Sequence, residues 1–119
     1  MSVSVQIKRI YAPVSDTDGY RVLVDRLWPR GQTKVEAQLD RWMKSLAPSS
    51  DLRKSWNHDP ERFEEFTKHY RRELDANEQV DEFLEFLETQ QRVTLLFAAK
   101  NEQINHAVVL RDYLLEQLG

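Results

Sequence analysis

The fold of this chain can be predicted outward from residues 19–31, which read GYRVLVDRLWPRG. Residues 20–25 contain three apolar residues in succession, which is typical of a strand covered on both faces of a sheet. The strand stops at a loop that carries two arginines, an aspartate and a tryptophan, and that Pro29 and Gly31 close. Ordering such side chains on a turn is costly unless they hold the protein's own backbone or a ligand. The stretch therefore predicts a buried strand followed by a candidate site.

Two more strands are expected from the pattern of apolar residues. Val3, Val5 and Ile7 alternate with polar residues, which is the period of a half-buried strand. Residues 93–99, VTLLFAA, are almost wholly apolar and predict a central strand of a sheet covered by helices. The loop over residues 12–19 is short for a parallel crossover, so the direction of the first strand stays open at this point.

Helical spacing accounts for most of the remaining sequence. Thr33 and Glu36 have the spacing of a capping box and predict a helix over 34–45, although a short helix followed by an extended segment through Trp42 fits almost as well. Ser49 or Ser50 is expected to cap a short helix that carries Leu52 and Trp56, and Asp59 and Pro60 are expected to open the next one. Three longer helices are predicted at about 60–74, 78–90 and 105–118.

These elements, with no repeat and no linker between them, predict one domain over residues 1–119. Its expected fold class is α/β, a single compact domain with a small, mostly parallel sheet of about three or four strands covered by helices.

Composition excludes several classes of site. The chain has 119 residues, no cysteine and a net charge of -3. The absence of cysteine excludes disulfides, thiolate metal sites and thiol nucleophiles. The chain has three histidines and no His-x-x-x-His pair, so we expect no metal and no cofactor. The acidic balance makes nucleic acid an unfavoured partner. The sequence shows neither a secretion signal nor a membrane span, so we expect a cytoplasmic protein with no membrane partner. The oligomeric state cannot be predicted from the sequence.

The candidate site lies where two buried strands end. Ligands of open α/β sheets collect outside the carboxyl ends of the strands, and loops follow the predicted strands at residues 25–31 and 100–105. If the two strands are parallel neighbours, their side chains meet on one rim and suit a small anion such as a phosphate or carboxylate. The expected ligand-binding residues are Arg26, Trp28, Arg30, Lys100, Asn105 and His106.

Structural roles explain some of the same residues. Asn105 is as well placed for an N-cap as for a ligand contact, and Asp25 could pair with Arg26 or Arg30 to lock the loop. Trp28 could belong to the core, because tryptophan is usually largely buried.

A second group of residues, WNHDP over 56–60, raises the question of catalysis. His58 beside Asp59 is a candidate general base, although helix capping by Asp59 explains the same residues. His106 and His58 are therefore the candidate catalytic residues. Three functions remain open, in this order: a protein that binds a small anion, an enzyme that uses histidine acid/base chemistry on an anionic metabolite, and a module that contacts nucleic acid or another protein.

The chain resembles the YeaO-like family, a branch of the domain of unknown function numbered 488. The stretches that carry the resemblance are KRIY (8–11), DGYRVLVDRLWPRG (18–31), LAPS (46–49), HDP (58–60), LLFAAK (95–100) and NHA (105–107). The resemblance implies a compact cytoplasmic α/β domain of bacteria or archaea and implies no particular activity. Other branches carry Cys-Ala-Glu after the last strand and Cys-His-Arg at the start of the last helix. Here the matching positions are residues 97–99 and 105–107, which lack cysteine, so thiol or metal chemistry of those branches is not available.

Overall fold

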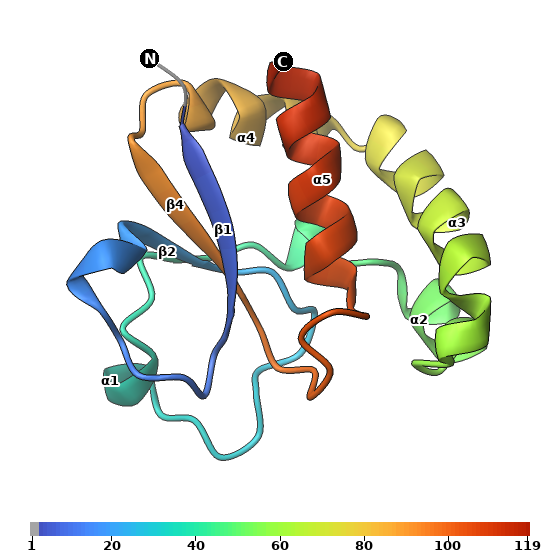
Figure 1. Cartoon of the computed structure of the whole chain (residues 1–119), viewed down its shortest axis with the longest axis horizontal. Helices are drawn as coiled ribbons and strands as arrows, with labels where there is room; N and C mark the ends of the chain where they lie inside the picture. The colour runs from blue at the N-terminus through green and yellow to red at the C-terminus, as the bar shows by residue number, and fades with distance from the viewer. Residues whose placement is uncertain (1–2) are drawn as a thin grey trace.

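Four parallel strands form the sheet of this protein, for which the computed structural model describes residues 3–119. The strands are β1 (Ser4–Arg9), β2 (Tyr20–Leu23), β3 (Arg41–Trp42) and β4 (Arg92–Phe97), and their order is β1-β4-β2-β3 (Figure 1). Every neighbouring pair is parallel. The predicted α/β class is therefore confirmed, β4 is central as its apolar sequence indicated, and the direction of β1 is now fixed.

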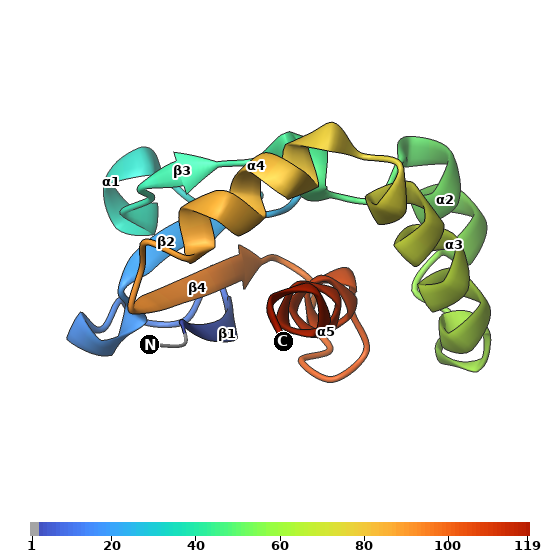
Figure 2. The same ribbon diagram turned by 90° about the horizontal axis from the view of Figure 1, so that it is seen from above.

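The four longer helices lie on one side of the sheet. These are α2 (Ser50–Trp56), α3 (Phe63–Asp75), α4 (Glu78–Leu87) and α5 (His106–Leu118). Of these, α5 packs on the strands, α3 packs on α5, and α2 packs on α3. Figure 2 shows α3, α4 and α5 on one side of the strands and α1 (Lys34–Ala37) on the other. Val22, Val93 and Leu95 project into this helical layer and are fully buried there with the apolar sides of the helices. The main hydrophobic core thus lies between the sheet and these helices.

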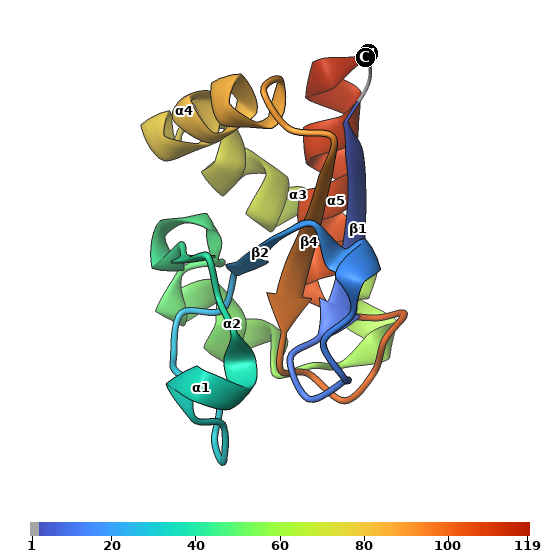
Figure 3. The same cartoon turned by 90° about the vertical axis from the view of Figure 1, so that its left-hand side faces the viewer.

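On the opposite side of the sheet lie α1 and loops of the chain, as Figure 3 shows. A small apolar cluster formed by Ile10, Leu23, Ala37 and Leu96 occupies part of this face. Because Leu23 is buried here and Val22 and Val24 are buried on the helical side, β2 is covered on both faces, as its sequence predicted.

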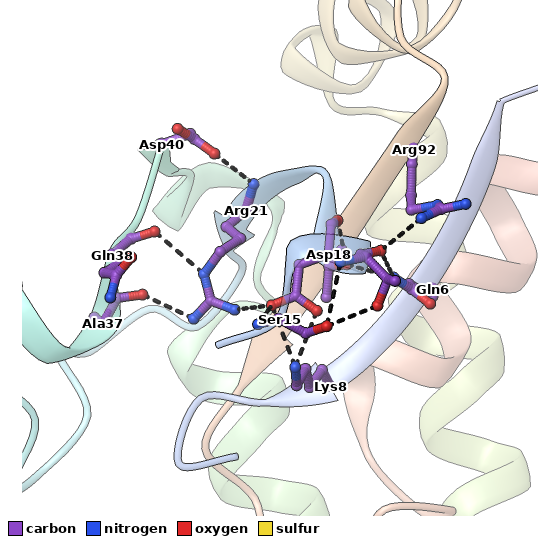
Figure 4. Close-up of polar contacts among 11 residues, drawn as sticks. Gln6, Lys8, Ser15, Asp18, Arg21, Ala37, Gln38, Asp40 and Arg92 are labelled. Carbon is purple, nitrogen blue, oxygen red and sulfur yellow. Dashed lines mark hydrogen bonds and ion pairs between the residues drawn. The ribbon is translucent and has the colours of Figure 1, made fainter. Parts of the chain in front are cut away.

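A buried ion network occupies the rest of that face (Figure 4). Asp18, on a short 3₁₀ turn (Asp16–Asp18), is 2% exposed and lies 2.9 Å from the Nζ of Lys8 and 2.5 Å from the Nη1 of Arg21. Arg21 also donates to the carbonyls of Ala37 and Gln38, so its guanidinium ties β2 to α1. Burial raises the pKa of Asp18, but hydrogen bonds from the backbone of Ser15 and from the two cations outweigh it and hold the pKa below its ordinary value.

The predicted helix over 34–45 is wrong, and the alternative of a short helix followed by an extended segment is confirmed. The capping box of Thr33 and Glu36 is present, but α1 ends after one turn because Gln38 adopts a left-handed conformation with φ of 45°. Asp40 then accepts the backbone N–H of Arg21 at 2.8 Å, and the next two residues pair with β2 as β3. Long-range backbone bonding therefore overrides the helical spacing here.

The other predicted helices are present with small shifts of their ends. Ser49 caps α2, and Asp59 caps a 3₁₀ turn, Pro60–Arg62, that leads into α3. The helix predicted to reach residue 90 ends at Leu87. None of the helices in residues 3–119 is long and apolar enough to span a membrane.

Candidate functional site

An open cleft of about 650 Å³ lies at the carboxyl ends of β2 and β4. The two strands are parallel neighbours, which is the condition under which the predicted residues were expected to meet. The chain leaves β2 toward α1 and leaves β4 toward α5 on the opposite face, so the cleft lies at a switch point of the sheet. Of the predicted ligand-binding residues, the structure brings five to the wall of this cleft: Arg26, Trp28, Arg30, Lys100 and His106.

Asn105 does not line the cleft. It is fully buried, its side-chain oxygen accepts the backbone N–H of Val108 at 3.0 Å, and its amide donates to the carbonyl of Asn101 at 2.8 Å. The side chain therefore caps α5, the structural role that the sequence analysis considered beside ligand binding.

Asp25 and His106 lie against each other in the wall of the cleft. Asp25 Oδ2 accepts the backbone N–H of Ala98 at 3.0 Å, while Oδ1 lies 3.1 Å from His106 Nε2. The same Nε2 lies 3.0 Å from the carbonyl oxygen of Val24. Asp25 therefore joins the ends of β2 and β4 and does not form the expected pair with Arg26 or Arg30. Nε2 of His106 is occupied by the protein, and Nδ1 has no hydrogen-bond partner within residues 3–119.

Arg26 is committed to the backbone of a neighbouring segment. Its Nε and Nη2 donate to the carbonyls of Pro48 and Ala47 at 3.1 and 3.3 Å. The adjoining carbonyl of Leu46 accepts the hydroxyl of Tyr70, whose pKa burial raises well above its usual range. We call residues 45–49 the strap. Through its two hydrogen bonds Arg26 fixes the strap as one wall of the cleft. The side chain of Arg26 therefore shapes the cleft more than it offers hydrogen-bond donors to a ligand.

Trp28 and Trp42 support the loop that follows β2. The ring of Trp28 meets the ring of Trp42 edge-on with centroids 5.3 Å apart, and its Nε1 donates to the carbonyl of Gln32. Trp42 Nε1 donates to the carbonyl of Asp25 at 2.7 Å. Trp28 is half-buried, so one side of its ring belongs to a small core while the residue also lines the cleft.

Three cationic side chains in the wall are free of protein partners. Arg30 and Lys100 are exposed, and neither side chain has a hydrogen bond or ion pair within the described part of the chain. The third is Arg53 on α2, whose Nε is buried without a hydrogen-bond partner. Arg53 was not among the residues predicted from the sequence, because nothing local signals that α2 approaches the ends of the strands. Asp25 is the one acidic residue in the wall, so the cleft is positively charged on a chain whose net charge is -3.

His58 also lines the cleft, but it makes no pair with its neighbour Asp59. Asp59 uses its carboxylate to accept the backbone N–H of Glu61, and the ring of His58 lies with its centroid 5.0 Å from the ring of Trp56. His58 has φ of 56°, which holds an exposed side chain in a conformation that non-glycine residues rarely adopt. Among residues 3–119, no three histidine, aspartate or glutamate side chains gather in a way that could hold a metal ion.

Comparison with known proteins gives relatives over almost the whole chain. A family model described as the inactive DUF488-N3 subclade matches residues 4–119. "Uncharacterized protein YeaO" of Escherichia coli (strain K12) is 44% identical over 112 residues, 94% of this chain and 97% of that protein. "Uncharacterized protein Rv3073c" of Mycobacterium tuberculosis (strain ATCC 25618 / H37Rv) is 39% identical over 110 residues, 92% of each. No solved structure gives a significant match.

Proposed function

We propose that this member of the inactive DUF488-N3 subclade, and so of the YeaO-like branch that its sequence indicated, binds a small anion in the cleft. The anion carries a phosphate or a carboxylate, and its partners are Arg30, Arg53, Lys100 and His106. The proposal includes the cytoplasmic location expected from the sequence.

The observation that carries this proposal is the state of Arg53. A buried donor without an acceptor costs about 1–3 kcal/mol, so its presence calls for a partner from a ligand or from solvent. Nε of Arg53 is such a donor, and its residue lines a cleft where cations outnumber carboxylates. The outer guanidinium nitrogens of Arg53, for which residues 3–119 supply no acceptor, would give a phosphate or carboxylate in the cleft charge-assisted hydrogen bonds.

Binding is favoured over catalysis for two reasons. The family description itself reads inactive, and the chain has no cysteine to act as a nucleophile. The contact between Asp25 and His106 resembles an oriented acid/base pair, but the nitrogen that faces Asp25 also contacts the Val24 carbonyl, so this pair is explained by its structural role.

Nucleic acid is a less suitable partner than a small anion. Four lysine and arginine side chains line the cleft, and one of them, Arg26, already donates to the backbone, so the remaining donors suit one small anion better than a polymer. The exposed side of α4 carries three glutamates and an aspartate and no basic residue, and this helix would repel a phosphate backbone.

Thermal unfolding against a panel of anions tests the proposal. The panel contains inorganic phosphate, sulfate, sugar phosphates, nucleotides and carboxylates, and the proteins are the wild type, Arg30→Gln and Arg72→Gln. Arg72 is an exposed arginine on α3 that does not line the cleft, so it is a matched control. An anion at about one hundred times its dissociation constant should stabilise the wild type by about 2.7 kcal/mol.

The expected result is a rise in melting temperature that Arg72→Gln retains and Arg30→Gln reduces. Absence of any rise across the panel, or an equal rise in both variants, would reject the cleft as an anion site.

A further inference from the structure

We propose that the ligand of the cleft is an organic anion whose phosphate or carboxylate is attached to a flat apolar group. This inference rests on the proposed function and adds the chemical class of the ligand. It follows from three features of the cleft: its volume, the chemistry of its walls and the places from which its cations come.

The volume of the cleft exceeds what a bare oxyanion requires. Pockets for organic ligands measure about 300–1,000 Å³, whereas a phosphate occupies little more than the space of a few water molecules. At about 650 Å³ the cleft falls within the range for organic ligands. A phosphate alone would leave most of it filled with water.

The walls of the cleft are mainly apolar. Two tryptophans and two prolines contribute from different segments: Trp28 and Pro29 from the loop after β2, Pro48 from the strap, and Trp56 from the end of α2. Ala98, Ala99 and Ile104 line it after β4. Rings of this kind pack best against a flat group, because such a group makes broad contact with the faces and edges of rings.

Leu27 shows that the protein itself does not bury all of this apolar surface. It lines the cleft and is 60% exposed, and the neighbouring Tyr11 is 40% exposed with its hydroxyl bound to the carbonyl of Arg30. Exposed apolar side chains gathered around a concave, positively charged site are typical of a ligand-binding surface. A ligand with an apolar body would cover them.

The cations of the cleft come from three different elements of the fold. Arg30 follows β2, Lys100 follows β4 and Arg53 lies on α2. The backbone carbonyls of Ala98 and Ala99 are already occupied by the side chain of Arg9, so this part of the wall offers few acceptors. The polar recognition is therefore directed at a negatively charged group, and the remainder of the ligand meets apolar surface.

Calorimetric titration with four probes tests this class. The probes are inorganic phosphate, glycerol phosphate, 1-naphthyl phosphate and 1-naphthol. Glycerol phosphate is a phosphate monoester without an apolar group, and 1-naphthol has the apolar group without the phosphate. We expect 1-naphthyl phosphate to bind with a dissociation constant at least about tenfold lower than that of glycerol phosphate or 1-naphthol.

The outcomes separate this inference from the proposed function. Equal affinity for the three phosphates would overturn the inference and leave anion binding standing. Equal affinity for 1-naphthyl phosphate and 1-naphthol would overturn anion binding, as would binding of no probe. Trp28→Phe and Arg30→Gln are tested with the same probes. If the inference is correct, Arg30→Gln weakens every phosphate, and Trp28→Phe weakens 1-naphthyl phosphate more than glycerol phosphate.

Discussion

Replacing Asp18 by asparagine should destabilise the protein strongly, because the carboxylate neutralises two cations on the loop-covered face of the sheet. The side chains of Asp18 and Arg21 are 3% and 5% exposed, so loss of the carboxylate charge would leave a buried guanidinium without a counterion. Removing one partner of a buried ion pair costs about 3–5 kcal/mol. For a domain of this size that corresponds to a fall in melting temperature of roughly 12–20 °C.

The control for Asp18→Asn is Asp16→Asn, two residues away on the same 3₁₀ turn but exposed. It should change the free energy of unfolding by less than about 0.5 kcal/mol. Urea unfolding of both variants, with the slope of the transition unchanged, measures the two values on one scale. A loss below about 1 kcal/mol in Asp18→Asn, or equal losses in the two variants, would refute the reasoning.

The same carboxylate makes stability depend on pH in a defined direction. The pKa of Asp18 in the folded protein lies below the ordinary value of 3.8. A depressed folded pKa contributes stability that is fully present above the unfolded pKa and is lost as the pH falls through the folded pKa. The difference in unfolding free energy between the wild type and Asp18→Asn should therefore be constant near neutral pH and shrink below about pH 4. A difference that grows on acidification would contradict the assignment.

Three further predictions concern other parts of the chain. Gly19→Ala should lower the free energy of unfolding by about 3 kcal/mol, because φ of Gly19 is +65° and the new Cβ would lie 2.3 Å from a backbone oxygen of β4. Gly31→Ala has open space around it and should lower the free energy of unfolding by about 1 kcal/mol. Urea unfolding of the two variants measures both values. Arg53→Met should weaken phosphate binding in calorimetry without lowering the free energy of unfolding, because it removes a buried donor that the protein does not satisfy. Burial and a hydrogen bond to Asp75 raise the pKa of Tyr113 to about 12. Tyr113→Phe should therefore lower the free energy of unfolding by about 1 kcal/mol at pH 8. This difference between the wild type and the variant should disappear as the pH rises from about 10 to 12, which unfolding measurements across that range would show.

Much of the fold could be predicted because local patterns and long-range packing agree. The apolar run of β4 predicted a central strand, and the caps at Ser49 and Asp59 were visible as sequence spacing. The segment after α1 could not be predicted in the same way. Its extended conformation depends on Asp40 accepting the backbone N–H of Arg21, and on Trp42 reaching the carbonyl of Asp25, both partners distant in the sequence.

The sequence predicted only those residues of the candidate site that follow the ends of strands. The loops after β2 and β4 meet because those strands are neighbours, a possibility that the sequence allowed but did not decide. Arg53 comes from a helix whose position follows from packing of its apolar side, and no spacing in the sequence reports that. Arg26 looked like a ligand contact because its use of the strap carbonyls is visible only in three dimensions.

An NMR titration of the wild type with inorganic phosphate, following backbone amide and tryptophan indole signals, would show whether the cleft binds an anion. The expected shifts are saturable and confined to the cleft, at Trp28, Arg30, residues 98–100 and the indole of Trp56. The same titration should leave residues 78–80, at the start of α4, unchanged. Shifts spread over several helix starts, or no saturable shift at the ends of β2 and β4, would contradict anion binding in the cleft.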